Sequence, residues 1–354
     1  MISNEADHVG RLPVCSAAGE EKKLALSNNM RVGQNPAKFI DKVAQPQNIT
    51  VAIVTYIPFL GSYYAKSLDL LKVCLDSLRK NTDLPYDLLV FDNASCNEIR
   101  QFLLERHHQG QIQFLLLSDK NVGKGGAWNI IFSGAPGEII AYADSDIYFY
   151  PGWLSALVHV LETVPNVGMV TGIPMWSPAE FSTNTLAWAN ENREAQLEKG
   201  QILPWEDYWR HSQSLGKDMK EARQHFEVRQ DICLKYQGQQ FYVGAGHFQF
   251  VARRKVLQSV LPIPSDRPMG QVRALDIAIN NNGYLRLSTS QWWVQHLGND
   301  LAGLVENQNG IKKAKRNKKS LSLKMNPWQS PILRKWMLWL HNKTFDFLYR
   351  SKAD

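Results

Sequence analysis

Short apolar runs alternate with helix-like stripes between residues 48 and 171, and this alternation limits the possible folds more than any other feature. The runs are rich in β-branched and aliphatic residues and lie at 48–55, 87–91, 112–117, 138–143 and 167–171. Between these runs, apolar residues recur at helical spacing, as the leucines from Leu68 to Leu78 do. Strands and helices that alternate every ~20–30 residues predict an α/β fold, a mostly parallel central sheet flanked by helices.

Polar motifs follow four of these predicted elements, at the points where strands or loops end. They are Thr55-Tyr56, Asp92-Asn93, the loop Asn121–Gly126, and Asp144-Ser145-Asp146. In open α/β sheets, ligands bind beyond the carboxyl ends of the strands. The sequence therefore predicts one ligand site at one edge of one sheet.

The pair Asp144 and Asp146 ends an apolar run that reads as a buried strand. Two carboxylates so close together require a cation or hydrogen-bond donors between them. The alternative is that they cap the next helix, because Asp and Ser are good N-cap residues.

The Gly-rich loop matches neither common phosphate-binding motif. Lys124 is followed by Gly125 rather than by Ser or Thr, so the loop is not a P-loop. Trp128 occupies the third glycine position of the dinucleotide fingerprint. Contact between the loop and an anion, with Lys124 as a point charge, and a plain turn both remain open.

The composition, 44% hydrophobic and 21% charged, is that of a soluble globular protein. No apolar run reaches the ~18 residues that a membrane-spanning helix needs, and acidic residues at the N-terminus argue against a secretory signal. The four cysteines are scattered, without a metal-binding or disulfide pattern. We expect a cytoplasmic protein.

The positive charge is concentrated at the C-terminal end. Residues 306–354 hold twelve Lys/Arg and three Asp/Glu, so the remaining residues sum to −2 of the net +7. The basic pI therefore gives no support for nucleic-acid binding. Trp and Leu interleaved with basic residues in 331–349 fit a helix on an anionic membrane surface. The alternative is a helix packed on its own domain or on a second subunit.

Taken in order, the motifs resemble the family 2 glycosyltransferases of the GT-A fold. The resemblance covers about residues 48–300. It rests on the strand end Thr55-Tyr56, Phe91–Ser95, Asn121–Gly123, Ala127–Asn129, Tyr142–Asp146, Ala274–Ala278 followed by Asn282–Tyr284, and Val294–Gly298. Leu275 stands where an acidic residue is more usual in the family.

The resemblance implies a UDP- or GDP-sugar donor. Asp146 and His296 would hold Mn²⁺ or Mg²⁺, and the imidazole favours Mn²⁺. Asp144 would accept hydrogen bonds from the ribose or the donor sugar, and Asp92 from a uracil-like base. The implied donor-binding set is Thr55, Tyr56, Asp92, Asn121, Gly123, Lys124, Asp144, Ser145 and Asp146.

The resemblance also implies a single displacement with inversion. Asp276 would be the general base for an acceptor hydroxyl, and Gly246 and His247 are acceptor-binding candidates. The expected acceptor is a saccharide or a lipid-linked saccharide. Two alternatives stay open: a nucleotidyltransferase that forms sugar nucleotides, and a non-catalytic nucleotide-sugar-binding protein on the same fold.

Four segments are predicted along the chain. Residues 1–47 form an N-terminal extension and 48–175 a nucleotide-sugar-binding half. An acceptor-binding half, 176–305, carries an aromatic-rich insertion in which 218–234 has helical spacing. Residues 306–354 form a basic amphipathic tail, expected to be helical.

Overall fold

The computed structural model describes residues 34–40, 42–268, 271–305 and 343. The predicted basic tail, apart from Lys343, and most of the N-terminal extension lie outside the described residues. Among the residues that are described, no helix combines the length and the hydropathy needed to cross a bilayer.

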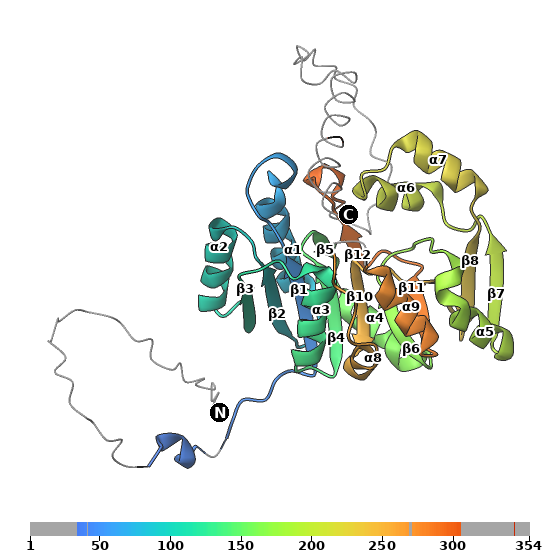
Figure 1. Ribbon diagram of the computed structural model, residues 1–354. Helices are drawn as coiled ribbons and strands as arrows, with labels where there is room; N and C mark the ends of the chain where they lie inside the picture. The colour runs from blue at the N-terminus through green and yellow to red at the C-terminus, as the bar shows by residue number, and fades with distance from the viewer. Residues whose placement is uncertain (1–33, 41, 269–270, 306–342, 344–354) are drawn as a thin grey trace, which may run out of the picture.

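A ten-stranded sheet runs through the molecule in the order β3-β2-β1-β4-β10-β6-β11-β9-β8-β7 (Figure 1). Its strands are β1 (Ile49–Thr55), β2 (Asp87–Asn93), β3 (Phe114–Ser118), β4 (Ile139–Asp144), β6 (Val167–Thr171), β7 (Ala195–Gly200), β8 (Asp231–Tyr236), β9 (Gln239–Val243), β10 (Gln249–Arg253) and β11 (Leu285–Thr289). A second sheet pairs β5 (Ile147–Phe149) with β12 (Val294–His296). The predicted α/β fold with a central sheet is confirmed.

The sheet is parallel only in part, which corrects the prediction of a mostly parallel sheet. Strands β3, β2, β1 and β4 are parallel neighbours, and so are β6 and β11. The other five pairings are antiparallel. The reason lies in the connections: β7, β8 and β9 follow one another as an antiparallel meander, and β10 enters between β4 and β6.

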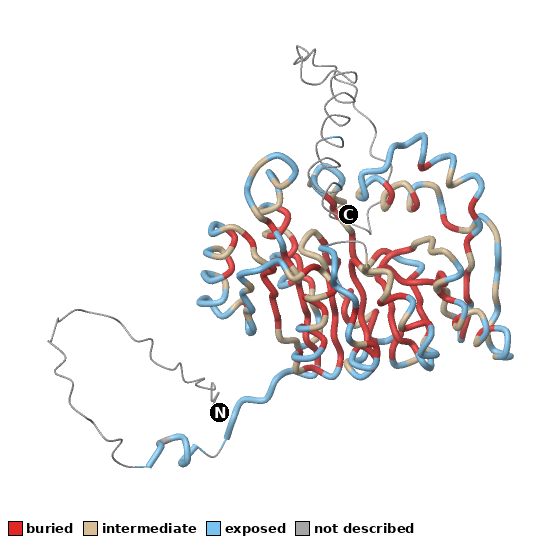
Figure 2. The backbone as a smooth tube through the Cα atoms, viewed as in Figure 1, coloured by how far each residue is buried: buried red, intermediate tan, exposed pale blue. Residues whose placement is uncertain are grey.

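Helices cover both faces of the sheet, because alternate strand residues face opposite sides. Val51 and Ile53 pack with α1, α2 and α4, whereas Ala52 packs with α3, α8 and α9. The buried strands appear red in Figure 2. The helices are α1 (Ser67–Asn81), α2 (Asn97–His108), α3 (Gly123–Gly134), α4 (Trp153–Thr163), α5 (Thr183–Glu191), α6 (Trp205–Ser214), α7 (Met219–Val228), α8 (Arg254–Ser259) and α9 (Arg273–Asn281); 3-10 turns lie at Pro36–Phe39, Ser62–Tyr64, Ala179–Ser182 and Leu301–Gly303.

The aromatic-rich insertion forms a small unit at one end of the sheet. Helices α6 and α7 lie above the sheet in Figure 1 and pack around Leu203 and Tyr208. A fully buried ion pair, Arg229 Nη2 to Asp231 Oδ2 at 3.1 Å, ties the end of α7 to this unit. The helical spacing predicted over 218–234 holds only for α7, since Asp231–Tyr236 is strand β8.

The register of the parallel strands places the predicted motifs side by side. Thr55 lies opposite Asp92 across β1 and β2, and Val54 lies opposite Asp144 across β1 and β4. The strand-end motifs therefore meet at one edge of the sheet, as predicted.

Candidate functional site

Asp144 ends β4, and both of its carboxylate oxygens are bound within the chain. Lys124 Nζ lies 2.7 Å from Oδ2, and the Tyr142 hydroxyl donates to Oδ1 at 2.6 Å. Lys124 thus supplies the cation that the repulsion between Asp144 and Asp146 requires. The helix-cap alternative does not apply, because strand β5 follows the pair at Ile147.

Asp146 faces His296 across the small second sheet. His296 Nε2 lies 3.3 Å from Asp146 Oδ2, and the Leu297 N–H donates to the Asp146 carbonyl at 2.9 Å. On its other side, His296 Nδ1 forms a 2.8 Å hydrogen bond with the hydroxyl of Ser214, the last residue of α6. The structure therefore brings together the two predicted metal ligands.

The Asp146–His296 pair shifts the pKa values of both groups. Burial acts to raise the pKa of Asp146, but the charge of His296 and its hydrogen bond outweigh burial and lower it. Burial acts to lower the pKa of His296, but Asp146 outweighs burial and raises it. Nearby, burial and then the charge of His296 lower the pKa of His211 to about 3. His211 is therefore neutral at physiological pH.

A divalent cation fits the Asp146–His296 pair. Asp146 Oδ1 is buried and has no hydrogen-bond partner among the described residues, so it is a free ligand atom next to an imidazole. Carboxylate and imidazole suit Mn²⁺ better than Mg²⁺. Within the described part of the chain, no group of three or more Asp, Glu, His or Cys side chains is placed to hold a metal ion. The remaining ligands would have to come from outside the protein.

The predicted nucleobase end lies where β1 and β2 stop. Thr55 is buried and its hydroxyl has no partner within the described ranges, whereas Tyr56 is exposed. The Asp92 carboxylate is fully buried, accepts from the Ser95 N–H at 3.2 Å and pairs with Arg100 Nε at 3.2 Å. Asp92 is therefore already paired with a cation within the chain.

Asn93 fixes the Gly-rich loop against the end of β2. Its amide donates to Asn121 Oδ1 at 3.0 Å and accepts from the Val122 N–H at 2.9 Å. Gly123 begins α3 with φ +71°, and a Cβ there would lie 3.0 Å from the Arg267 carbonyl. This position therefore favours glycine on two grounds, backbone conformation and space.

Asp276 lies on α9 within a cluster of positive partners. Its Oδ1 lies 2.8 Å from Arg286 Nη2, and its Oδ2 lies 3.5 Å from His247 Nδ1 and 3.6 Å from Arg273 Nη1. The Asp276 side chain is 1% exposed and that of His247 is 30% exposed. The predicted general base is thus buried, and its neighbour His247 is the more exposed of the two side chains.

Arg286 holds Asp276 and the two loops around it. The guanidinium is fully buried on β11 and donates to the carbonyls of Phe181 and Ala245, both at 2.6 Å. Burial lowers the pKa of Arg286, and the attraction of Asp276 opposes the shift. No motif in the sequence points to Arg286.

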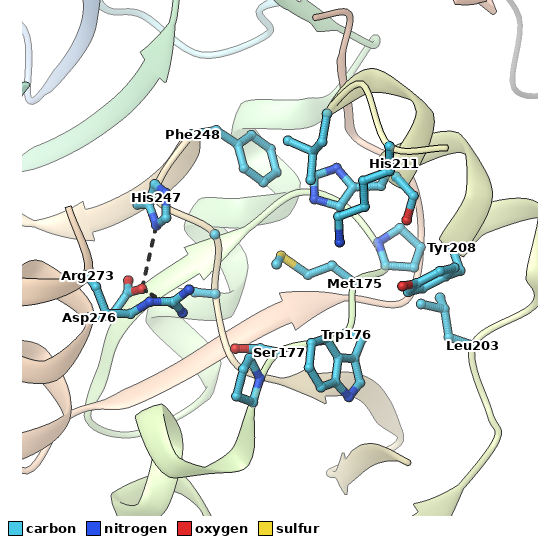
Figure 3. A pocket seen from close by; sticks show the side chains of 17 residues that line it. Met175, Trp176, Ser177, Leu203, Tyr208, His211, His247, Phe248, Arg273 and Asp276 are labelled. Carbon is cyan, nitrogen blue, oxygen red and sulfur yellow. Dashed lines mark ion pairs between the residues drawn. The ribbon is translucent and has the colours of Figure 1, made fainter. Parts of the chain in front are cut away.

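A cavity of about 220 Å³ opens beside His247 and Asp276 (Figure 3). Figure 3 shows His247, Arg273 and Asp276 on one side and His211, Tyr208 and Leu203 on the other. Gly246 also lines it, and a Cβ there would lie 2.4 Å from the Phe248 ring. The predicted acceptor residues therefore share one cavity with the predicted base.

The cavity and the Asp146–His296 pair are neighbours through a chain of rings. Phe248 lines the cavity, with its centroid 5.4 Å from that of His296 and 5.1 Å from that of His211. None of the predicted donor-binding residues lines the cavity. The structure thus forms two adjacent clusters, one at the strand ends and one around Asp276.

Comparisons with known proteins show a similarity to glycosyltransferases in the first part of the described chain. The sequence model of Glycosyl transferase family 2 matches residues 57–228. An uncharacterized glycosyltransferase of Nostoc sp. (strain PCC 7120) is 27% identical over 96 residues, which are 27% of this chain and 30% of that relative. This chain therefore spans under a third of the length of the curated relative that it matches.

Solved structures show a partial likeness. S. aureus TarS, residues 1–349, is 14% identical, with 70% of this chain and 60% of that chain covered and a TM-score of 0.41. The mannosyltransferase PcManGT from Pyrobaculum calidifontis, in complex with GDP-Man and Mn²⁺, is 18% identical, with 71% and 56% covered and a TM-score of 0.40.

Proposed function

We propose that this chain, whose residues 57–228 match the model of Glycosyl transferase family 2, transfers a sugar from a UDP- or GDP-sugar to a saccharide or a lipid-linked saccharide. The observation that carries the proposal is the pairing of two clusters. Strand-end carboxylates with Lys124 lie on one side, and a cavity ending at Asp276 lies on the other.

The strand-end cluster would bind the donor. Thr55, Tyr56 and Asp92 would contact the nucleobase, and Asp144 would accept from the ribose or the donor sugar. Lys124, in exchange for its contact with Asp144, would bind a phosphate oxygen at the start of α3. Asn121, Gly123 and Ser145 would shape this side of the site.

Asp146 and His296 would hold the divalent cation. When bound, such a cation stabilises the negative charge that develops on the leaving nucleoside diphosphate. The protein's own contribution is to orient the two ligands. Ser214 fixes the His296 ring, and the β5–β12 pairing fixes its distance from Asp146.

The Asp276 cluster would receive the acceptor's proton during a single displacement with inversion. Asp276 is almost fully buried and pairs with Arg286 and Arg273, whereas the His247 side chain is 30% exposed. We therefore place the accepting atom on His247, with Asp276 orienting the imidazole, as general-base pairs require. Direct transfer of the proton to Asp276 is the alternative within the same cluster.

The test is release of nucleoside diphosphate from a panel of UDP- and GDP-sugars, with Mn²⁺ and with excess chelator. We expect turnover for one donor, and loss of turnover in chelator and in Asp146→Ala. Asp69→Ala, an exposed aspartate on α1, is the matched control and should keep full activity. Full turnover in chelator would refute the metal role. Binding of nucleotide without any turnover would indicate a non-catalytic binding protein.

A lipid-linked acceptor would account for the basic tail. Its twelve Lys/Arg and interleaved Trp and Leu suit contact with an anionic bilayer. Sedimentation of the full chain with anionic and with neutral vesicles tests this. Equal recovery with both would count against a membrane role for the tail.

A further inference from the structure

Basic residues outnumber acidic residues in the lining of the cavity. Two of its residues, Lys217 and Arg273, are basic, and Asp276 is the sole carboxylate among the described lining residues. Arg286 lies 2.8 Å from Asp276 and is fully buried behind it. The negative charge of Asp276 is therefore already offset, and the cavity is left with an excess of positive charge.

Neither cation has a strong partner of its own. Arg273 is 3.6 Å from Asp276, its side chain is 44% exposed, and it lies over the Phe181 ring at 4.3 Å. Lys217 follows the end of α6 and has no ion-pair partner in the described part of the chain. Its charge is close enough to contribute to the lowered pKa of His211, after burial and His296.

The remaining wall is mostly apolar, because the polar tips of its aromatic residues are used elsewhere. Trp176 Nε1 donates to the Gln230 carbonyl at 3.0 Å, and the Tyr208 hydroxyl is bonded to His225 Nδ1 at 2.7 Å. What these two residues present to the cavity is ring surface, which suits the apolar face of a sugar ring. Specific polar recognition is left to Lys217, Arg273 and His247.

We propose that this cavity binds the acceptor through an anionic group, a carboxylate or a phosphate on a saccharide, held by Lys217 and Arg273. The inference rests on the proposed glycosyltransferase function and narrows the acceptor to acidic saccharides. An arginine can bind either group with two parallel N–H···O bonds, and a lysine adds a point charge. The two cations would fix the acceptor so that a hydroxyl faces His247.

The experiment compares glucuronate, glucose 6-phosphate and glucose by calorimetry on the full chain. UDP or GDP with Mg²⁺ is present throughout, so that the strand-end site is occupied. Charge-assisted contacts predict that one or both acidic sugars bind roughly 10- to 100-fold more tightly than glucose. The preference should shrink as NaCl is added, because salt screens exposed charges. The two acidic sugars separate carboxylate from phosphate recognition.

Variants assign the effect to the cavity. Lys217→Gln and Arg273→Gln should each remove most of the preference for an acidic sugar, and Lys217→Arg should keep it. Lys220→Gln, an exposed lysine on the neighbouring α7 that does not line the cavity, is the matched control. Circular dichroism confirms that each variant is folded.

Three outcomes overturn the inference: equal affinity for all three sugars, no binding of either acidic sugar, or a preference that survives Lys217→Gln and Arg273→Gln. Failure of the proposed function is separate from these. It would appear as no nucleotide release from any UDP- or GDP-sugar, whether or not acidic sugars bind.

Discussion

His247 Nδ1 lies 3.5 Å from Asp276 Oδ2, and both side chains line the same cavity. The histidine side chain is 30% exposed and the aspartate 1% exposed. The imidazole is therefore the more accessible of the two side chains to an acceptor in the cavity, and we expect it to receive the proton.

The first prediction concerns proton transfer. His247→Gln should lower kcat for sugar transfer by ~10²-fold or more, the usual range for loss of a general base. Nucleotide affinity should stay within about twofold, because His247 does not belong to the strand-end cluster. Steady-state kinetics and nucleotide titration measure the two quantities. His159→Gln on α4 is the control. If His247→Gln keeps full kcat while Asp276→Asn loses it, the proton goes to Asp276 itself.

The second prediction concerns stability. Asp276→Ala leaves the buried Arg286 guanidinium without its carboxylate, and breaking a buried pair in this way costs about 3–5 kcal/mol. Arg273→Ala removes a half-exposed partner and should cost under ~1 kcal/mol. Urea unfolding of both variants gives the two free energies. Equal values would mean that Arg286 finds another partner or is solvated.

The third prediction concerns pH and metal. The folded pKa of His296 is raised above its ordinary 6.5. Its contribution to stability is thus fully present below pH 6.5 and is lost as pH rises through the folded pKa. The pKa of Asp146 is lowered from 3.8, so its contribution is present above pH 3.8 and is lost as pH falls through the folded pKa.

Without metal, the melting temperature should therefore decline above pH 6.5, and His296→Gln should reduce that decline. Mn²⁺ should restore more stability at pH 8 than at pH 6, because a metal binds the neutral imidazole. Thermal melts at the two pH values, with and without Mn²⁺, test both statements. An equal effect of Mn²⁺ at both pH values would argue against His296 as a ligand.

The fourth prediction concerns the close contact between Gly298 and Ser214, the last residue of α6. Gly298 has φ +66°, and a Cβ there would lie 2.2 Å from the Ser214 carbonyl. Gly298→Ala should therefore push Ser214 away from His296 and weaken both stability and Mn²⁺ binding. Gly283→Ala is a matched control, since Gly283 has φ +84° with open space around it. The control isolates the backbone strain, about 1–2 kcal/mol. Identical behaviour of the two variants would show that the contact is harmless.

The strand-end cluster was predictable because parallel strands carry their carboxyl ends to one edge. Asp144, Asp146 and Asp92 each follow an apolar run, so their meeting follows from topology alone. The role of Arg286 was not predictable. The sequence alone does not show whether a charged residue within a strand faces solvent or the protein interior. Its role depends on α9, which folds back over β11.

The insertion was the hardest part to predict. Spacing of apolar residues in 218–234 fits a helix, yet Asp231–Tyr236 pairs with β7 and β9. The signal for this hairpin is the two-residue turn Gln237-Gly238, where both φ angles are positive, +47° and +74°. That geometry is typical of a type I′ turn, but Gln is a less common first residue there than Asn or Asp.

Helix α6 contributes residues both to the cavity and to the surroundings of His296. Tyr208 and His211 line the cavity, and Ser214, at its end, orients His296. Donor and acceptor would thus share one wall, so a substitution that displaces α6 should raise the Michaelis constants of both substrates together.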